Sequence, residues 1–319
     1  MAKKEQKIRT QERYIFTNED LYRRVCGVND SGLKELERFL NVEIIPRGNA
    51  FILNGLDESV VYAIQFFKKL EDNFLTRPDR EHFDRFDINY LVRSKDTEPW
   101  NPSEKILTNF KGKPIYPKTA NQEKFVYSLM NNLISIAVGP AGTGKTFLSI
   151  ATACRMLQNG EVEKLILTRP AVEAGESLGF LPGDLVQKVD PFLRPIYDAL
   201  NECLGFERVQ LFLSTGKIEI APIAYMRGRT LNNAFIILDE AQNCTLSQLK
   251  MFLTRLGKNS KMAVSGDVTQ IDLPVGKSGF EKVYKALANT PQIGIVELYK
   301  EDITRHPLIE LIVEKLEGL

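Results

Sequence analysis

The sequence predicts an α/β protein in which a parallel β-sheet is covered by helices and is preceded by a small α+β unit. Three observations lead to this prediction. From Thr119 onward, short apolar runs alternate with helical segments, as in sheets buried on both faces. Residues 15–70 instead place two helical patterns around a pair of strands. Between these regions the chain is rich in proline and charge and has little period. We therefore expect a small domain at 1–72, a connector at 73–117 and the main domain at 118–319.

The first region has the pattern of an αββα unit. "LKELERFL" (33–40) is helix-like, and "VEIIPRGNAFILNG" (42–55) reads as two strands turning at Arg47 to Asn49. "ESVVYAIQFFKKLED" (58–72) supplies the second helix.

The main region contains six apolar runs that we predict to be strands. They are "LISIAVG" (133–139), "KLILTRP" (164–170), "IEIAPIAYM" (218–226), "FIILDEA" (235–241), "KMAVSG" (261–266) and "IGIVELY" (293–299). Helical segments between consecutive runs favour parallel pairing, because parallel strands need a crossover connection.

Composition excludes several classes of protein. The chain has 319 residues and a formal net charge of +1, so charge gives no overall attraction to nucleic acid or membrane. The 4 cysteines and 2 histidines are scattered and form no metal-binding spacing. No apolar run approaches the roughly 18 residues of a membrane span. We expect a cytoplasmic protein with reduced cysteines and no membrane partner.

The most informative motif is "GPAGTGKT", which follows a predicted strand and opens a predicted helix. This is the G-x-x-x-x-G-K-[ST] loop, whose backbone N–H groups cradle nucleotide phosphates. Lys145 would reach the β and γ phosphates, and the hydroxyl of Thr146 would face Mg²⁺. The predicted nucleotide-binding residues are Gly139, Pro140, Ala141, Gly142, Thr143, Gly144, Lys145 and Thr146.

Two further strand ends carry polar side chains. "AFIILDEAQN" ends in Asp239, which would hold the metal, and Glu240, which would orient and deprotonate water. An acidic strand end seen alone is as often a solvated cap. "KMAVSGDVTQIDLP" places Gln270 where it could report the γ-phosphate, although a plain polar turn explains that stretch equally well. In a RecA-like core the strand of "KMAVSG" lies between the strand before the phosphate loop and the strand that ends in Asp239 and Glu240.

These blocks, together with "LTRPAVEAGESLGFLPGDLVQKVDPFLRPIYDAL" and "DITRHPL", resemble the PhoH family of ATPases. These are P-loop proteins related to the core of superfamily 1 helicases. The resemblance covers residues 118–316 and implies a RecA-like core that binds ATP with Mg²⁺. It also implies that Gln122, in "TANQEKF", reads adenine, although a polar residue at a helix start has a plain structural explanation.

The resemblance further implies a role in RNA handling, such as ribosomal RNA maturation. The N-terminal unit resembles a K-homology fold, whose GXXG loop clamps a nucleic-acid backbone. Here the loop reads Gly27, Val28, Asn29, Asp30. Because the acid replaces the second glycine where phosphate would approach, a docking or assembly role is the alternative for this unit.

The catalytic arginine is the open question. Phosphoryl transfer usually needs an arginine beyond the P-loop lysine, and too few residues follow "SGDVTQIDLP" for a second RecA-like core. We therefore expect a neighbouring subunit to supply it within a hexameric ring. Arg305 is the first candidate, as the arginine of the final superfamily 1 motif. The others are Arg169, Arg227, Arg229 and Arg255.

Two functions fit these observations. The first is an oligomeric ATPase motor acting on RNA, with Lys145, Glu240, Gln270 and Arg305 as its catalytic set. The second is a slow nucleotide-gated switch or adaptor that controls a protein partner such as an endoribonuclease. The intact phosphate loop favours the first, and the neutral charge favours the second.

Overall fold

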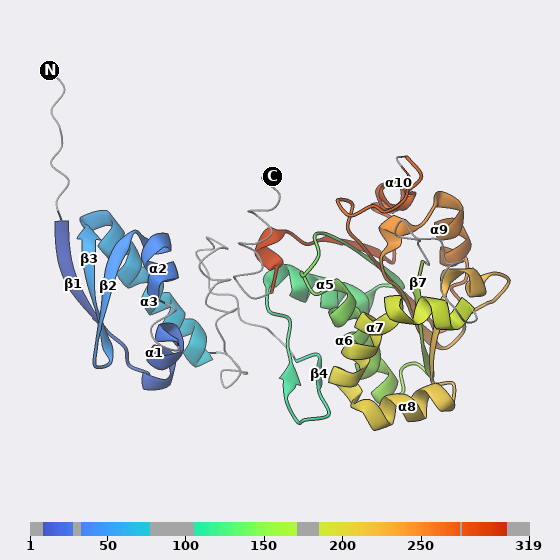
Figure 1. The fold of residues 1–319 in the computed structure, drawn as a ribbon, viewed down its shortest axis with the longest axis horizontal. Helices are drawn as coiled ribbons and strands as arrows, with labels where there is room; N and C mark the ends of the chain where they lie inside the picture. The colour runs from blue at the N-terminus through green and yellow to red at the C-terminus, as the bar shows by residue number, and fades with distance from the viewer. Residues whose placement is uncertain (1–8, 28–32, 77–104, 171–184, 275, 305–319) are drawn as a thin grey trace, which may run out of the picture. The chain divides into compact units, whose positions relative to one another are not determined.

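The computed structural model describes residues 9–27, 33–76, 105–170, 185–274 and 276–304 (Figure 1). The described residues up to 76 belong to one compact unit and those from 105 to 304 to a second. Within these residues no helix combines the length and apolar character needed to cross a lipid bilayer.

The first unit is a three-stranded antiparallel sheet packed against helices, with strand order β1-β3-β2. Its elements are β1 (Arg9–Ile15), α1 (Glu19–Cys26), α2 (Leu33–Leu40), β2 (Val42–Arg47), β3 (Ala50–Leu56) and α3 (Asp57–Thr76). The predicted helix, strand pair and helix are present, but β1 and α1 were not predicted. β1 lies at the sheet edge and is mostly exposed, so its sequence carries no apolar alternation.

Aromatic rings form the centre of this unit. Phe16, Phe51 and Phe67 are buried, and their ring centroids lie 5.0 to 5.7 Å apart in edge-to-face pairs. Glu71 of α3 is also buried and accepts hydrogen bonds from the Tyr14 hydroxyl at 2.6 Å and the Thr17 N–H at 2.7 Å. A buried carboxylate satisfied in this way ties α3 to the segment between β1 and α1.

The second unit contains a six-stranded sheet of order β11-β6-β10-β9-β7-β8, and every pairing is parallel. The strands are β6 (Ile134–Val138), β7 (Lys164–Arg169), β8 (Ile218–Pro222), β9 (Ala234–Leu238), β10 (Lys261–Gly266) and β11 (Ile293–Glu297). Each of the six predicted runs contains a strand, although in the run 218–226 the strand ends at Pro222 and a 3₁₀ turn follows. β10 lies between β6 and β9 as expected. The predicted RecA-like arrangement is therefore correct.

Helices cover both faces of this sheet. They are α5 (Ala120–Asn131), α6 (Lys145–Gln158), α7 (Leu185–Leu204), α8 (Phe206–Ser214), α9 (Leu246–Leu253) and α10 (Phe280–Leu287), with short 3₁₀ turns at Ile223–Met226, Ala241–Asn243 and Lys300–Asp302. Ala137 of β6 packs in the cluster that includes α5 to α8. Its neighbours Ile136 and Val138 pack in the opposite cluster with α9 and α10.

Part of the predicted connector packs on the second unit. A short hairpin of β4 (Leu107–Thr108) and β5 (Pro114–Ile115) follows Lys105. Ile106, Leu107 and Ile115 are buried in the same cluster as α6. Residues 105–117 therefore lie with the core, because three apolar side chains interrupt an otherwise polar stretch.

An ion pair joins the edge strand β8 to the loop that follows it. Both terminal nitrogens of Arg229 donate to the carboxylate of Glu219, the second at 2.8 Å. This hydrogen bond lowers the pKa of Glu219 below its ordinary value of 4.5 and raises that of Arg229. Because the folded pKa of Glu219 lies below the unfolded one, the pair contributes stability above pH 4.5 that is lost as pH falls through the folded pKa.

We predict that Glu219→Gln lowers the free energy of unfolding at pH 7 by roughly 0.5 to 1 kcal/mol, since both side chains remain about one-third exposed and screened. The difference from wild type should shrink on acidification below pH 4.5. Denaturant titrations across this range measure it. Glu281→Gln, which removes a fully exposed pair with Lys285 on α10, is the control and should change stability less. An equal deficit at all pH values contradicts the prediction.

Candidate nucleotide-binding and catalytic site

The loop of residues 139–144 connects β6 to α6 and is held in a tight turn. Gly144 precedes the helix with φ +83°, a left-handed conformation that glycine adopts without strain. At Gly139 a Cβ atom would lie 2.3 Å from the carbonyl oxygen of Leu298, so a side chain does not fit there. The Gly139 N–H donates to Gly266 O at 3.2 Å, which joins the loop to the end of β10.

Lys145 folds back over this loop. Its ammonium group donates to the carbonyl oxygens of Gly139 at 2.6 Å and Pro140 at 2.7 Å, and the side chain is largely buried. The Thr143 hydroxyl donates to Pro140 O at 2.9 Å. Phosphate oxygens are stronger acceptors for an ammonium than carbonyls are, so the lysine is placed to exchange these bonds for a phosphate.

Asp239 joins three elements of the site. Its Oδ1 atom accepts hydrogen bonds from Thr146 Oγ1 of α6 at 2.7 Å and from Ser265 Oγ of β10 at 2.9 Å. The residue is 4% exposed. The sequence-predicted pair Thr146 and Asp239 is therefore in direct contact, and it presents oxygen ligands of the kind that Mg²⁺ takes.

Glu240 follows Asp239 with its backbone in the left-handed region, at φ +55° and ψ +41°. Its Oε1 atom accepts a hydrogen bond from Arg169 Nη2 at 2.8 Å, and its Oε2 atom accepts one from Gln242 Nε2. The sequence indicated Arg169 only as a candidate for the catalytic arginine and did not single out Gln242. The available signal was the position of Gln242 beside the acidic pair.

Asp267, rather than the side chain of Gln270, contacts the phosphate loop among the described residues. Its Oδ2 atom accepts from the Ala141 N–H at 3.0 Å, and its own N–H donates to Gln242 Oε1 at 3.0 Å. Gln270 lies on the turn that follows, where its N–H donates to Asp267 O at 3.2 Å and its side chain is exposed. Its role as a phosphate sensor stays a prediction.

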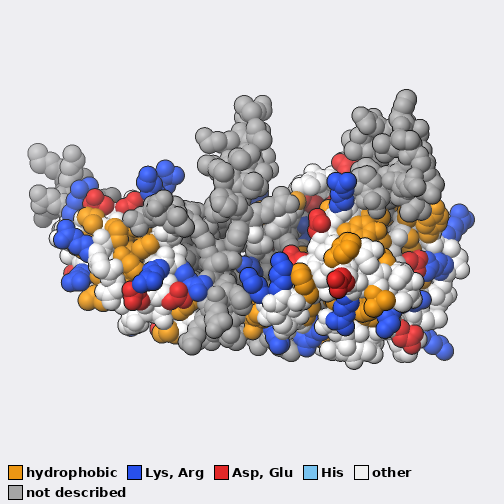
Figure 2. Space-filling view, turned by 60° about the horizontal axis from the view of Figure 1, so that its bottom comes forward, with side chains coloured by type: hydrophobic (Ala, Val, Ile, Leu, Met, Phe, Trp, Pro, Cys, Tyr) orange, Lys and Arg blue, Asp and Glu red, His pale blue; other side chains and the backbone are white. Residues whose placement is uncertain are grey.

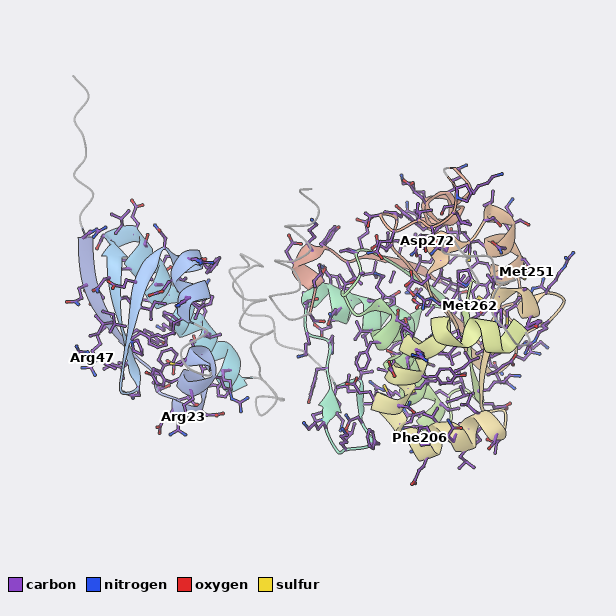
Figure 3. The ribbon with its side chains drawn as sticks, in the orientation of Figure 1. Arg23, Arg47, Phe206, Met251, Met262 and Asp272 are labelled. Atoms are coloured by element: carbon purple, nitrogen blue, oxygen red, sulfur yellow. The ribbon has the colours of Figure 1, made fainter. Side chains whose placement is uncertain are left out.

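The segments after β9 and β10 are tied together beyond the site. Asn243 Nδ2 donates to Asp272 at 3.0 Å, and the Asp272 N–H donates to Asn243 Oδ1 at 2.8 Å. Figure 3 labels Asp272 together with Met262, which lies in β10. The two hydrogen bonds between Asn243 and Asp272 hold together the segments that follow β9 and β10, where the polar side chains gather.

Gln122 lies against the phosphate loop, and it is 2% exposed. Its Nε2 donates to Thr143 O at 3.1 Å, and its Oε1 accepts from the Lys118 N–H at 2.7 Å. Both ends of the amide are thus engaged by backbone groups of the chain. In this conformation Gln122 braces α5 against the loop, and reading adenine would require it to exchange these bonds.

Sequence analysis missed Asp302. This buried carboxylate accepts from Thr119 Oγ1 at 2.6 Å, Asn121 Nδ2 at 3.1 Å and the Tyr299 N–H at 2.8 Å. Two residues later, the Thr304 N–H donates to Gly142 O at 3.1 Å. The segment after β11 therefore holds both the start of α5 and the phosphate loop, through residues far apart in the sequence that no local pattern signals.

The arginine candidates separate by their contacts. Arg229 pairs with Glu219, and Arg255 donates to Met251 O and Arg229 O at 3.0 and 2.9 Å. Arg227 is exposed. Arg305 lies outside the described residues. Of the described candidates, Arg169 is the one whose guanidinium contacts a predicted catalytic side chain.

A family model described as "PhoH-like protein" matches residues 114–317. The chain belongs to the PhoH family. It is 49% identical over 294 residues to the PhoH-like protein of Bacillus subtilis, covering 90% of this chain and 91% of that protein. It is 46% identical over 200 residues to Protein PhoH of Escherichia coli, covering 62% of this chain and 56% of that protein.

Among solved structures, the large terminase of a thermophilic bacteriophage aligns with 62% of this chain and 50% of its own, with 12% identity and a TM-score of 0.39. A likeness this distant supports no functional argument. The family match and the phosphate loop on a six-stranded parallel sheet are sufficient to identify a PhoH-like P-loop nucleotide-binding protein.

We predict that Lys145→Ala weakens nucleotide binding by about 10- to 100-fold, because a charge-assisted hydrogen bond to phosphate is lost. Titration with a fluorescent ATP analogue measures the affinity, and circular dichroism checks the fold. Lys282→Ala, at an exposed lysine of α10, is the control. Unchanged affinity in a folded Lys145→Ala protein contradicts the assignment of the loop.

Proposed function

We propose that this PhoH-like protein hydrolyses ATP with Mg²⁺ and acts in RNA metabolism as an oligomer. The observation that carries the hydrolytic part is the convergence, at one end of neighbouring strands, of the loop lysine, the contact between Thr146 and Asp239, and Glu240. Ligands of open parallel sheets bind at this carboxyl edge.

The donor set fits a magnesium ion. A hydroxyl and a carboxylate lie within hydrogen-bond distance of each other, at 2.7 Å, and both supply the hard oxygen ligands that Mg²⁺ prefers. Thr146 and Asp239 would hold the ion, with Ser265 orienting the carboxylate. When bound, the ion would neutralise charge on the phosphates.

The remaining groups have distinct tasks in this proposal. Backbone N–H groups of the loop and the N-terminus of α6 bind the phosphates, and the Lys145 ammonium stabilises negative charge at the γ position. Glu240 orients the attacking water and accepts its proton. Arg305 of a neighbouring subunit adds the positive charge that the γ-phosphate needs beyond Lys145 and Mg²⁺. Because one subunit then completes the site of the next, we propose a ring.

We predict that Glu240→Gln binds ATP normally but hydrolyses it at least about a hundredfold more slowly, since general-base catalysis contributes on that order. Asp239→Asn should instead weaken the Mg²⁺-dependent part of nucleotide affinity, because a neutral amide replaces the charged carboxylate. Single-turnover hydrolysis and ATP-analogue titrations with and without Mg²⁺ separate the two effects. If both variants lost affinity equally and neither trapped ATP, the division of roles would be wrong.

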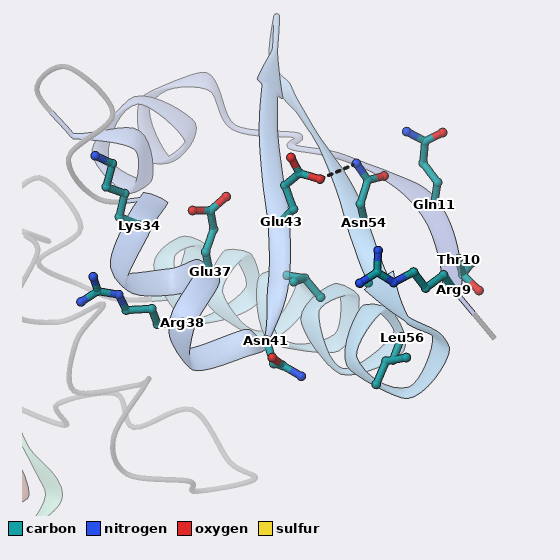
Figure 4. Close-up of a pocket in the computed structure, with 12 residues that line it drawn as sticks. Arg9, Thr10, Gln11, Lys34, Glu37, Arg38, Asn41, Glu43, Asn54 and Leu56 are labelled. Atoms are coloured by element: carbon teal, nitrogen blue, oxygen red, sulfur yellow. Dashed lines mark hydrogen bonds between the residues drawn. The ribbon is translucent and has the colours of Figure 1, made fainter. Parts of the chain in front are cut away.

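The RNA part of the proposal is supported by the family resemblance and by an open hollow in the first unit (Figure 4). Arg9, Lys34 and Arg38 line it, together with Glu37 and Glu43. Glu37 accepts the N–H of Ile44 at 2.8 Å, and Glu43 accepts from Asn54 at 3.1 Å, so both carboxylates are engaged. Three cations against two carboxylates leave the hollow with a small excess of positive charge, which favours a phosphate backbone.

One feature of the surface favours the nucleotide-gated switch over the RNA-acting motor. Positive and negative side chains of the described residues intermingle on the face that Figure 2 displays, so this face gives RNA no broad basic surface. Residues 28–30 of the GXXG-like loop lie outside the described residues. A nucleotide-gated adaptor that controls a protein partner therefore remains the alternative function.

The rate of ATP turnover with and without single-stranded RNA distinguishes the two functions. We predict a several-fold increase with RNA for an RNA-acting motor, and a smaller increase for the Lys34→Ala/Arg38→Ala variant. The RNA response should weaken as salt rises, because phosphate contacts release counterions. An ATP turnover rate that does not change when RNA is added at low salt would favour the switch.

A further inference from the structure

The carboxylate of Glu240 is held at both oxygen atoms. The guanidinium of Arg169 donates to one at 2.8 Å, and the side-chain amide of Gln242 donates to the other. The Arg169 side chain is 19% exposed and that of Glu240 is 33% exposed. A charge-assisted bond in a partly buried position orients its acceptor more strongly than an exposed ion pair does.

The strand order explains why Arg169 reaches this carboxylate. β7 pairs with β9 in parallel, with Thr168 opposite Leu238, and the Asp239 N–H donates to Thr168 O at 3.0 Å. Arg169 at the end of β7 therefore lies beside the first residues after β9. The left-handed backbone of Glu240 is a conformation that non-glycine residues adopt when surrounding contacts impose it.

The orientation of the Gln242 amide follows from the hydrogen bond that it accepts from Asp267. Gln242 is 1% exposed, and its Oε1 atom accepts the backbone N–H of Asp267. Because a backbone N–H can only donate, the carbonyl end of the amide faces Asp267 and the NH₂ end faces Glu240. Asp267 in turn accepts the N–H of Ala141 in the phosphate loop. An unbroken series of hydrogen bonds thus runs from the loop to the proposed base.

We propose that Arg169 is a positioning residue of the same chain, which together with Gln242 fixes Glu240 for its work as general base. This rests on the proposed ATP hydrolysis. A carboxylate has about four lone-pair sites, so two fixed bonds restrict its rotation and still leave sites to accept a proton from water. Arg169 acts through Glu240 and not on the phosphates, a task distinct from that of an arginine supplied by a neighbour.

The test is a double-mutant cycle on the full-length protein. Arg169→Ala should lower kcat for ATP about tenfold or more while KM and the affinity for an ATP analogue stay unchanged, because misplacing a catalytic group slows the chemical step. Arg169→Lys should recover part of the rate. In the Glu240→Gln background, Arg169→Ala should have no further effect, because the group through which Arg169 acts is already lost. Lys285→Ala, which removes a cation from an exposed pair, is the control.

Different results overturn the proposal in different ways. If the two substitutions multiply their effects, Arg169 acts on the phosphates directly. If Arg169→Ala raises kcat, the arginine restrains the base. If Arg169→Ala and Arg169→Lys both lose ATP affinity, the residue serves binding or folding.

Mixing the two impaired proteins gives an independent check. Arg169→Ala mixed with Glu240→Gln should show no more activity than the sum of the two proteins measured separately, since both residues belong to one site of one chain. Recovery on mixing would overturn the assignment and show that Arg169 serves its neighbour. The proposed hydrolysis itself fails if Glu240→Gln and wild type turn over ATP equally, a result separate from any behaviour of Arg169.

Discussion

The hydrogen bonds to the Asp239 carboxylate join the elements that make the site. Asp239 stands at the end of β9, Thr146 belongs to the first turn of α6, and Ser265 belongs to β10. Three stretches of chain far apart in sequence meet at one oxygen atom. The parallel order that places β10 between β6 and β9 makes this meeting possible, because it brings the carboxyl ends of the three strands to one edge.

A second set of contacts spreads outward from the same edge. Asp267 joins the phosphate loop to Gln242, and Gln242 joins β10 to Glu240. Most of these groups are buried or partly buried, where an unpaired polar atom is costly and each bond constrains the next. The loop that would receive phosphates and the carboxylate that would activate water therefore belong to one connected network.

The other side of the loop is held by the segment after β11. Leu298 packs so closely on Gly139 that a Cβ atom is excluded, and Thr304 binds the loop through its backbone. Asp302 fixes the start of α5, from which Gln122 reaches the loop. The far end of this unit thus shapes the nucleotide site, although it contributes no residue of the phosphate loop or of the acidic pair.

The six strands of the second unit, the phosphate loop and the acidic pair could be predicted from sequence alone, because these features are local. A buried parallel strand needs a short apolar run, and a loop that wraps phosphate needs glycines at set spacing. The sequence did not reveal the polar edge strand β1, since that strand buries little apolar surface and carries no pattern. Three contacts depend instead on how the strands and helices pack. Arg169 contacts Glu240, Asp267 rather than the side chain of Gln270 contacts the loop, and Asp302 braces α5. Such pairings depend on which strands become neighbours, and hydrogen bonds between residues 71 to 183 positions apart leave no periodic trace in a single sequence.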